Sequence, residues 1–149
     1  MERKIVIHEN NFDKVRKLIQ ENSGKRIIFS SDDEEVSRKV LEKENIEVLL
    51  INQTGRKDFH KQRDSGFNHV MAKLAKKKGV IIGINLDELV KSSEKEKAAI
   101  IARIRQNIKI CNKNKLKMKF IYKSQKRNLY DLAALGLVLG MPTWMTREL

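Results

Sequence analysis

Short apolar runs alternate with amphipathic stretches along this chain of 149 residues. The runs cover residues 4–7, 26–30, 48–51, 80–85 and 118–122, and each has the length and composition of a β-strand. The stretches between them place apolar residues three and four positions apart, which is the spacing of a helix that buries one face. This alternation predicts an α/β fold, and we expect one domain over residues 1–149 with a parallel sheet and right-handed crossovers.

The helix expected before the fourth strand has well-marked ends. Asp64 or Ser65 can cap its first turn, and Gly79 supplies a left-handed stop. Its apolar stripe contains Phe67, Val70, Met71, Leu74 and Ala75. The opposite face is basic and contains Lys73, Lys76 and Lys77. The run that follows Gly79 is apolar at nearly every position, as expected of a strand that is buried on both faces.

The first two helices also have capping signals. Asn10 or Asn11 can cap the first, and Gly24 is expected to end it. The sequence Ser31-Asp32-Asp33-Glu34 has the spacing of a capping box before the second helix. Acids at this position favour the positive end of the helix dipole, so the acidic cluster requires no metal.

Two further helices are expected in the second half of the chain. Ser93, with Glu96 three residues later, opens a helix that runs to about residue 114. The core stripe of this helix contains Ile100, Ile101, Ile104, Ile108 and Cys111. Asn128 caps a last helix over residues 129–140 that is apolar nearly all round. We expect either the core or a partner to cover that helix.

The net charge of +13 is concentrated in two segments. Residues 54–79 carry eight lysines and arginines against two acids, and residues 91–128 carry thirteen against two. Within the second segment, Arg105, Lys109 and Lys113 lie one helical turn apart with no acid between them. A solvated helix face usually mixes both signs, whereas a focal positive field favours a polyanion such as nucleic acid.

Little in the sequence indicates catalysis or a cofactor. The strands end near His8, Ser30, Asn52, Asn85 and Ser124, a set that is weak for catalysis. The three histidines show no metal-ligand spacing, and the glycines show no nucleotide-binding spacing. Aromatic residues make up 5% of the chain and are not interleaved with the basic ones, so phosphate and shape recognition of folded RNA is favoured over base stacking. The single Cys111 fits a buried small hydrophobe, and no apolar run is long enough to span a membrane.

Three motifs resemble the archaeal and eukaryotic ribonuclease P protein component three, the thirty-kilodalton subunit family. The first is Arg63-Asp64-Ser65-Gly66-Phe67-Asn68-His69, the second is the basic stretch 103–111, and the third spans residues 130–135 with Gly140-Met141. The resemblance covers roughly residues 54–141. Leu129 and Ala133 stand where the family has Pro and Arg. The chain is also shorter than the family, so we expect a shortened member.

The resemblance implies an irregular barrel of the triosephosphate-isomerase type. Five strands cannot close an eight-stranded barrel, so we expect an open, incomplete version, with a flavodoxin-like three-layer sandwich as the alternative. It also implies an RNA-binding subunit of ribonuclease P that assists RNA-catalysed removal of the 5′ leader from precursor tRNA. The expected partners are ribonuclease P RNA, protein component two and the other protein subunits, with Mg²⁺ in the RNA active site, no cofactor in the protein, no membrane and a cytoplasmic location.

We assign no catalytic residue and no metal ligand to this chain. The residues expected to contact RNA or a partner are Arg56, Lys57, Lys61, Arg63, Asp64, Ser65, Asn68, His69, Lys73, Lys76, Lys77, Arg105, Lys109, Lys113, Lys126 and Arg127. Two alternatives from other classes stay open: a small metal-dependent phosphoesterase of the related barrel family, and a generic basic module that binds nucleic acid.

Overall fold

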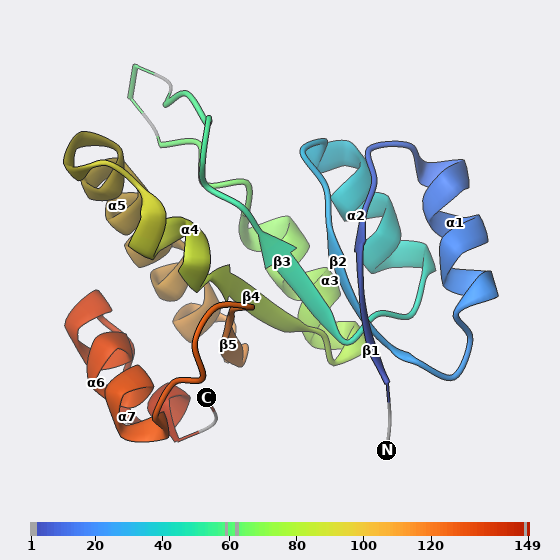
Figure 1. Ribbon diagram of the computed structural model, residues 1–149. Helices are drawn as coiled ribbons and strands as arrows, with labels where there is room; N and C mark the ends of the chain where they lie inside the picture. The colour runs from blue at the N-terminus through green and yellow to red at the C-terminus, as the bar shows by residue number, and fades with distance from the viewer. Residues whose placement is uncertain (1–2, 59, 62, 148) are drawn as a thin grey trace.

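The computed structural model describes residues 3–58, 60–61, 63–147 and 149 (Figure 1). Its elements in chain order are β1 (Lys4–His8), α1 (Phe12–Glu21), β2 (Arg26–Ser30), α2 (Glu34–Lys43), β3 (Val48–Ile51), α3 (His69–Lys78), β4 (Ile81–Asn85), α4 (Leu86–Lys91), α5 (Glu94–Lys113), β5 (Met118–Ile121), α6 (Leu129–Leu139) and α7 (Thr143–Thr146). All five predicted strands are present. The short helices α4 and α7 were not predicted.

The five strands form one parallel sheet in the order β1-β2-β3-β4-β5. When each strand adds beside the previous one through a right-handed crossover, every connecting helix falls on the same face of the sheet. Figure 1 shows this arrangement, with α1 and α2 beyond β1 and β2, and α3 behind β3. A flavodoxin-like sandwich would place the first strand between the second and third, so that alternative is wrong. The fold is the expected open, incomplete barrel, and β1 and β5 are the two edges of its sheet.

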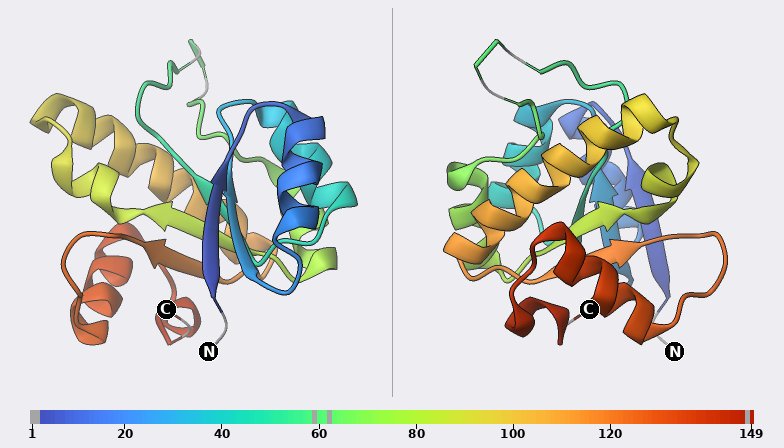
Figure 2. Two further views of the ribbon diagram at one scale, coloured as in Figure 1. Left: turned by 45° about the vertical axis from the view of Figure 1, so that its right-hand side comes forward. Right: turned by 90° about the vertical axis from the view of Figure 1, so that its left-hand side faces the viewer.

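The two faces of the sheet have different neighbours. On the helix side, alternate strand residues such as Ile7, Phe29 and Leu49 join the large core that the helices cover. On the other side, Ile28, Val48 and Leu50 form a small separate cluster. Figure 2 shows the curved sheet and its helices from two further directions. The face without helices corresponds to the interior of a closed barrel.

The beginning of α3 differs from the prediction. The helix starts at His69, and its N-cap is Asn68, whose side chain accepts a hydrogen bond from the backbone N–H of Met71. Neither Asp64 nor Ser65 caps the helix, because both lie in the preceding loop. Val70 was assigned to the apolar stripe but is 60% exposed, and the residues of α3 that are buried are Met71, Ala72 and Ala75. The predicted stop at Gly79 is confirmed by its left-handed backbone conformation.

Two smaller predictions, on the caps of α2 and α1, also need correction. The N-cap of α2 is Asp33 rather than Ser31, and the Ser31 hydroxyl instead accepts the backbone N–H of Asp33. Helix α1 ends at Glu21, and Gly24 lies in the turn that follows. The last helix, α6, buries one side on the core but leaves several apolar side chains in solvent: Leu129, Tyr130, Leu137 and Val138. The loop predicted over residues 54–62 is present, and Phe59 and Gln62 within it lie outside the described residues.

Candidate nucleic-acid interface

The loop between β3 and α3 is held against α5 by one buried arginine. Arg103 is 5% exposed, and its guanidinium donates hydrogen bonds to the carbonyl oxygens of Gln53 (3.0 Å) and Arg56 (2.7 Å). Its Nε also donates to the Asp58 carboxylate at 3.0 Å. The guanidinium therefore satisfies three acceptors of a segment that has no regular secondary structure of its own.

The Asp58 carboxylate is stabilised in its charged form by these contacts. The hydrogen bond from Arg103 lowers the pKa of Asp58, and the backbone N–H of Asp64, which donates to Oδ1 at 3.0 Å, lowers it further. Asp58 thus links Arg103 of α5 to the backbone of Asp64, nearer the end of the loop.

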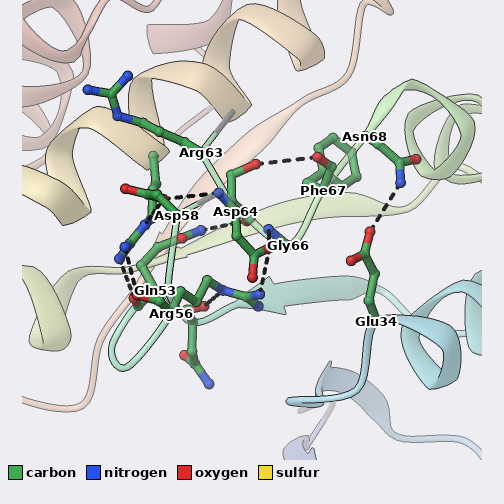
Figure 3. Close-up of polar contacts among 12 residues, drawn as sticks. Glu34, Gln53, Arg56, Asp58, Arg63, Asp64, Gly66, Phe67 and Asn68 are labelled. Carbon is green, nitrogen blue, oxygen red and sulfur yellow. Dashed lines mark hydrogen bonds and ion pairs between the residues drawn. The ribbon is translucent and has the colours of Figure 1, made fainter. Parts of the chain in front are cut away.

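The polar residues of the heptapeptide 63–69 serve mainly to shape the backbone. Ser65 is buried, and its carbonyl oxygen accepts hydrogen bonds from the side-chain amides of Gln53 (2.8 Å) and Asn107 (3.2 Å). The Ser65 hydroxyl accepts a further bond from the Gln106 amide. The Asp64 carboxylate accepts the backbone N–H of Gly66. These contacts hold the β3–α3 loop against α5 (Figure 3).

Gly66 is required at its position for two reasons. Its φ of +71° lies in the left-handed region, which disfavours side chains. A Cβ at this residue would also lie 2.3 Å from Nη2 of Arg56. The Arg56 guanidinium packs over the glycine, donates to the Asn52 carbonyl oxygen at 2.6 Å and lies 3.5 Å from the Asp64 carboxylate. Arg56 is therefore largely committed to the loop itself.

Arg63 is the exception within the heptapeptide. Its carbonyl oxygen accepts a hydrogen bond from Gln106, but its side chain points away from the cluster (Figure 3). It lines a shallow hollow of about 430 Å³ together with Arg105 and Lys109 of α5. No acidic side chain lines this hollow, and none of the three cations forms an ion pair within the part of the chain that the structure describes.

The basic surface continues along α5 toward the end of α3. Lys113 is exposed one turn beyond Lys109. Nearby, the Lys76 ammonium donates to the Lys115 carbonyl oxygen at 3.0 Å, and the Asn114 amide lies 3.1 Å from Nδ1 of His69. These contacts bring the α3 residues of the predicted site beside the C-terminal end of α5.

The remaining predicted residues are dispersed. Lys57 and Lys61 are exposed in the loop after β3, and Lys73 and Lys77 are exposed on α3. Arg127 lies on the other side of Arg105, in the hollow that faces α6. The side chains of Asp64, Ser65 and Asn68 form hydrogen bonds with other groups of the protein. Asn68 also donates to the Glu34 carboxylate at 3.1 Å.

The carboxyl ends of the strands form a separate cavity of about 490 Å³. His8 and Ser30 meet there, with Nδ1 of the ring 2.7 Å from the hydroxyl, and Nε2 lies 3.3 Å from the Asp32 carboxylate. Asn85 donates to Asn52 at 2.8 Å. Among the described residues, no group of three or more His, Cys, Asp or Glu side chains is placed to hold a metal ion.

Cys111 is buried, as predicted, and burial raises the pKa of its thiol.

Sequence reasoning missed the residues that anchor the loop. Arg103 and Asn107 occupy the buried stripe of α5, at the same spacing as Ile100, Ile104 and Ile108. A polar residue at a core position must find partners, because an unsatisfied buried polar group is costly. That position on the stripe was the available signal.

Across the described residues, no helix is both long and apolar enough to cross a membrane.

Comparison with known proteins gives one consistent resemblance. No protein-family model matches the chain. Ribonuclease P protein component 3 of Methanococcus vannielii is 27% identical over 106 residues, which cover 71% of this chain and 43% of that protein. The protein of the same name from Methanocaldococcus jannaschii is 29% identical over 136 residues, covering 89% and 55% respectively. The resemblance inferred from the motifs is confirmed by these relatives.

A solved structure shares the fold. One chain in a cryo-EM structure of archaeal ribonuclease P with mature tRNA superimposes with a TM-score of 0.79 at 24% identity. The match covers 95% of this chain and 62% of that one. The chain thus spans about half the length of the curated relatives that it matches. The likeness to the solved chain supports the open barrel described above.

Proposed function

We propose that this chain is an RNA-binding protein subunit of ribonuclease P that assists RNA-catalysed removal of the 5′ leader from precursor tRNA. The observation that carries the proposal is the hollow lined by Arg63, Arg105 and Lys109, which we call the basic hollow. The matching relatives support the same assignment, because they are named ribonuclease P protein component 3 and match across most of this chain.

The basic hollow suits a phosphate backbone. Three cations converge on it from two segments that are about forty residues apart, and no acid of the hollow neutralises them. Holding like charges together is unfavourable unless an anion binds between them. Cations that bind phosphates release the counterions condensed on the RNA, so binding should weaken steeply as salt rises. The loop contacts of Arg103 and Ser65 keep the Arg63 backbone in place before RNA arrives, which lowers the ordering cost of binding.

The heptapeptide then has a divided role. Its internal residues build the loop, and Arg63 presents an exposed cationic side chain at the basic hollow. We infer that the contacts proposed for Asp64, Ser65 and Asn68 act through this positioning. Arg105, Lys109 and Lys113 extend the surface along one helix face, which suits the backbone of folded RNA.

The assembly that we propose contains ribonuclease P RNA, protein component two and the other protein subunits, and it acts in the cytoplasm. The RNA would carry the active site with its Mg²⁺, and this protein would help fold or hold that RNA. The matching chain comes from a ribonuclease P structure that contains tRNA, and this supports an assembly of the same kind.

The test is reconstitution of the holoenzyme with a triple variant, Arg63→Gln, Arg105→Gln and Lys109→Gln. We expect half-maximal stimulation of leader removal to require about tenfold more of the variant protein than of wild type, because three phosphate contacts are lost. The matched control removes three exposed lysines elsewhere, Lys14, Lys17 and Lys25, also as Gln.

Equal stimulation by the triple variant and wild type would contradict the proposal. Turnover of a phosphodiester by the pure protein with Mn²⁺ or Zn²⁺, abolished by substituting His8, would favour the phosphoesterase alternative instead.

A further inference from the structure

A second hollow lies between α4, α5 and α6, on the side of Arg105 away from Arg63. It encloses about 470 Å³, and we call it the apolar groove. Its walls include Val90 of α4, Ile101 of α5, and Leu135 and Val138 of α6. Figure 1 shows α6 below α4 and α5, so three helices bound the groove.

The walls of the apolar groove are more exposed than the core requires. Val90 is 49% exposed and Val138 is 77% exposed. Leu132 and Leu139 are buried in the core and also line the groove, so the groove continues the apolar face by which α6 packs on the core. The apolar face of a helix is normally covered along its whole width. An apolar hollow of this kind is typical of a binding surface.

The charged residues at the apolar groove are mostly cationic. Lys97, Arg105 and Arg127 line it against a single acid, Asp131. None of the three cations forms an ion pair among the residues that the structure describes. Nε of Arg127 is buried and has no hydrogen-bond partner within the same residues. The three cations therefore give the rim a positive field that favours an acidic ligand.

We propose that the apolar groove binds an amphipathic helix of a protein partner, with acidic residues flanking the apolar face of that helix. Apolar side chains of the partner would insert between Val90, Ile101 and Val138. A carboxylate would pair with the guanidinium of Arg127, and neighbouring acids would face Lys97 and Arg105. A groove between helices that presents apolar walls and a charged rim suits this mode of recognition.

Two other occupants fit the groove less well. A second copy of this chain would bring the same surface to both sides of a symmetric interface, so cations would face cations. RNA would match the charged rim but would place phosphates against apolar walls, where they gain nothing. The proposal goes beyond RNA binding and does not rest on it, because Val90, Leu135 and Val138 of the groove lie outside the basic hollow. Arg105 lines both, so a bound protein and a bound RNA would lie side by side.

The test uses two synthetic amphipathic helices with the same leucine face, one flanked by glutamates and one by lysines, titrated against the whole protein. We expect the glutamate peptide to bind at least about tenfold more tightly than the lysine peptide. Val138→Asp should abolish that binding, and Arg127→Glu should remove the preference between the peptides, because the rim would then carry two cations and two acids. The matched control is Leu137→Asp, an exposed leucine on α6 that does not line the groove, and it should bind like wild type.

Each other outcome overturns the proposal. Equal affinity for both peptides would show that the rim does not select acids. Absence of binding by either peptide would show that the groove is not a docking site. Dimerisation of the free protein that Val138→Asp removes and Leu137→Asp does not would assign the groove to a second copy. Loss of RNA binding in Val138→Asp, with peptide binding unchanged, would assign it to RNA.

Discussion

Basic side chains form different contacts in two regions of the molecule. The first region is the first third of the chain, and the second runs from the β3–α3 loop to α5. In the first third, three arginines form ion pairs: Arg16 with Glu44 and Arg26 with Glu47 between neighbouring elements, and Arg38 with Glu35 within α2. The charge of residues 1–53 is nearly balanced, with ten basic residues and eleven acids. Exposed pairs of this kind contribute little stability, but they leave no strong field at the surface.

The later region contains two classes of cation. Arg56 and Arg103 lie inward and bind carbonyl oxygens and carboxylates of the loop. Arg63, Arg105 and Lys109 lie outward, with no ion pair among the described residues. The comparison teaches that charge alone does not mark a binding residue. A paired, buried cation holds the structure, and an unpaired, exposed one is available for a ligand.

Two arginines on α5, Arg103 and Arg105, lie two residues apart on different faces and give the sharpest separation of these classes. We expect Arg103→Met to lower the free energy of unfolding by about 3 kcal/mol, because two carbonyl oxygens and Asp58 lose their donor. In a chain of this size the Tm should fall by roughly 10 °C. Arg105→Met is the matched control and should stay within about 0.5 kcal/mol. Urea unfolding of both proteins measures the difference, and equal destabilisation would remove the distinction between the two classes.

The same distinction applies within the heptapeptide. Asn68→Ala should cost about 1 kcal/mol of stability, because the N-cap of α3 loses its acceptor for the Met71 N–H. Asn68→Ser keeps a capping oxygen and should recover most of that loss. Arg63→Ala should melt close to wild type while weakening RNA binding. Thermal melts of the three variants test this, and a destabilised Arg63→Ala would show that Arg63 also holds the fold.

The smallest effect should appear in acid. Because the hydrogen bond from Arg103 lowers the pKa of Asp58 in the folded protein, the stability that this carboxylate contributes is complete above its unfolded pKa of about 3.9. That contribution is lost as the pH falls through the lower, folded value. The backbone N–H of Asp64 donates to Asp58, so its NMR shift should titrate with a midpoint below about 3.9. Asp58→Asn should abolish the titration, and a midpoint above 3.9 would contradict the contact.

The sequence predicted the regular elements well because their signals are local. Ser93 and Asn128 cap α5 and α6 as expected, and Gly79 ends α3. The beginning of α3 was predicted wrongly because the Ser65 hydroxyl accepts a hydrogen bond from Gln106, which is distant in sequence. A side chain that can cap a helix can also bond elsewhere, and only the tertiary contacts decide between the two.

The candidate site could be predicted in part for the same reason. The row of Arg105, Lys109 and Lys113 follows from helical spacing and is exposed as expected. The placement of Arg63 beside that row depends on the loop contacts to Arg103, which cross forty or more residues of sequence. No local pattern encodes such a contact. The polar positions on the buried stripe of α5 were the one sign that something had to pack there.

The salt dependence of RNA binding tests the central claim most directly. Affinity for ribonuclease P RNA would be measured from low to moderate salt for wild type, for the Arg63, Arg105 and Lys109→Gln variant, and for the Lys14, Lys17 and Lys25→Gln control. We predict that the slope of log affinity against log salt decreases by about two to three in the first variant and stays unchanged in the control, because each lost phosphate contact removes about one unit. Equal slopes for the two variants would contradict the assignment of RNA binding to the basic hollow.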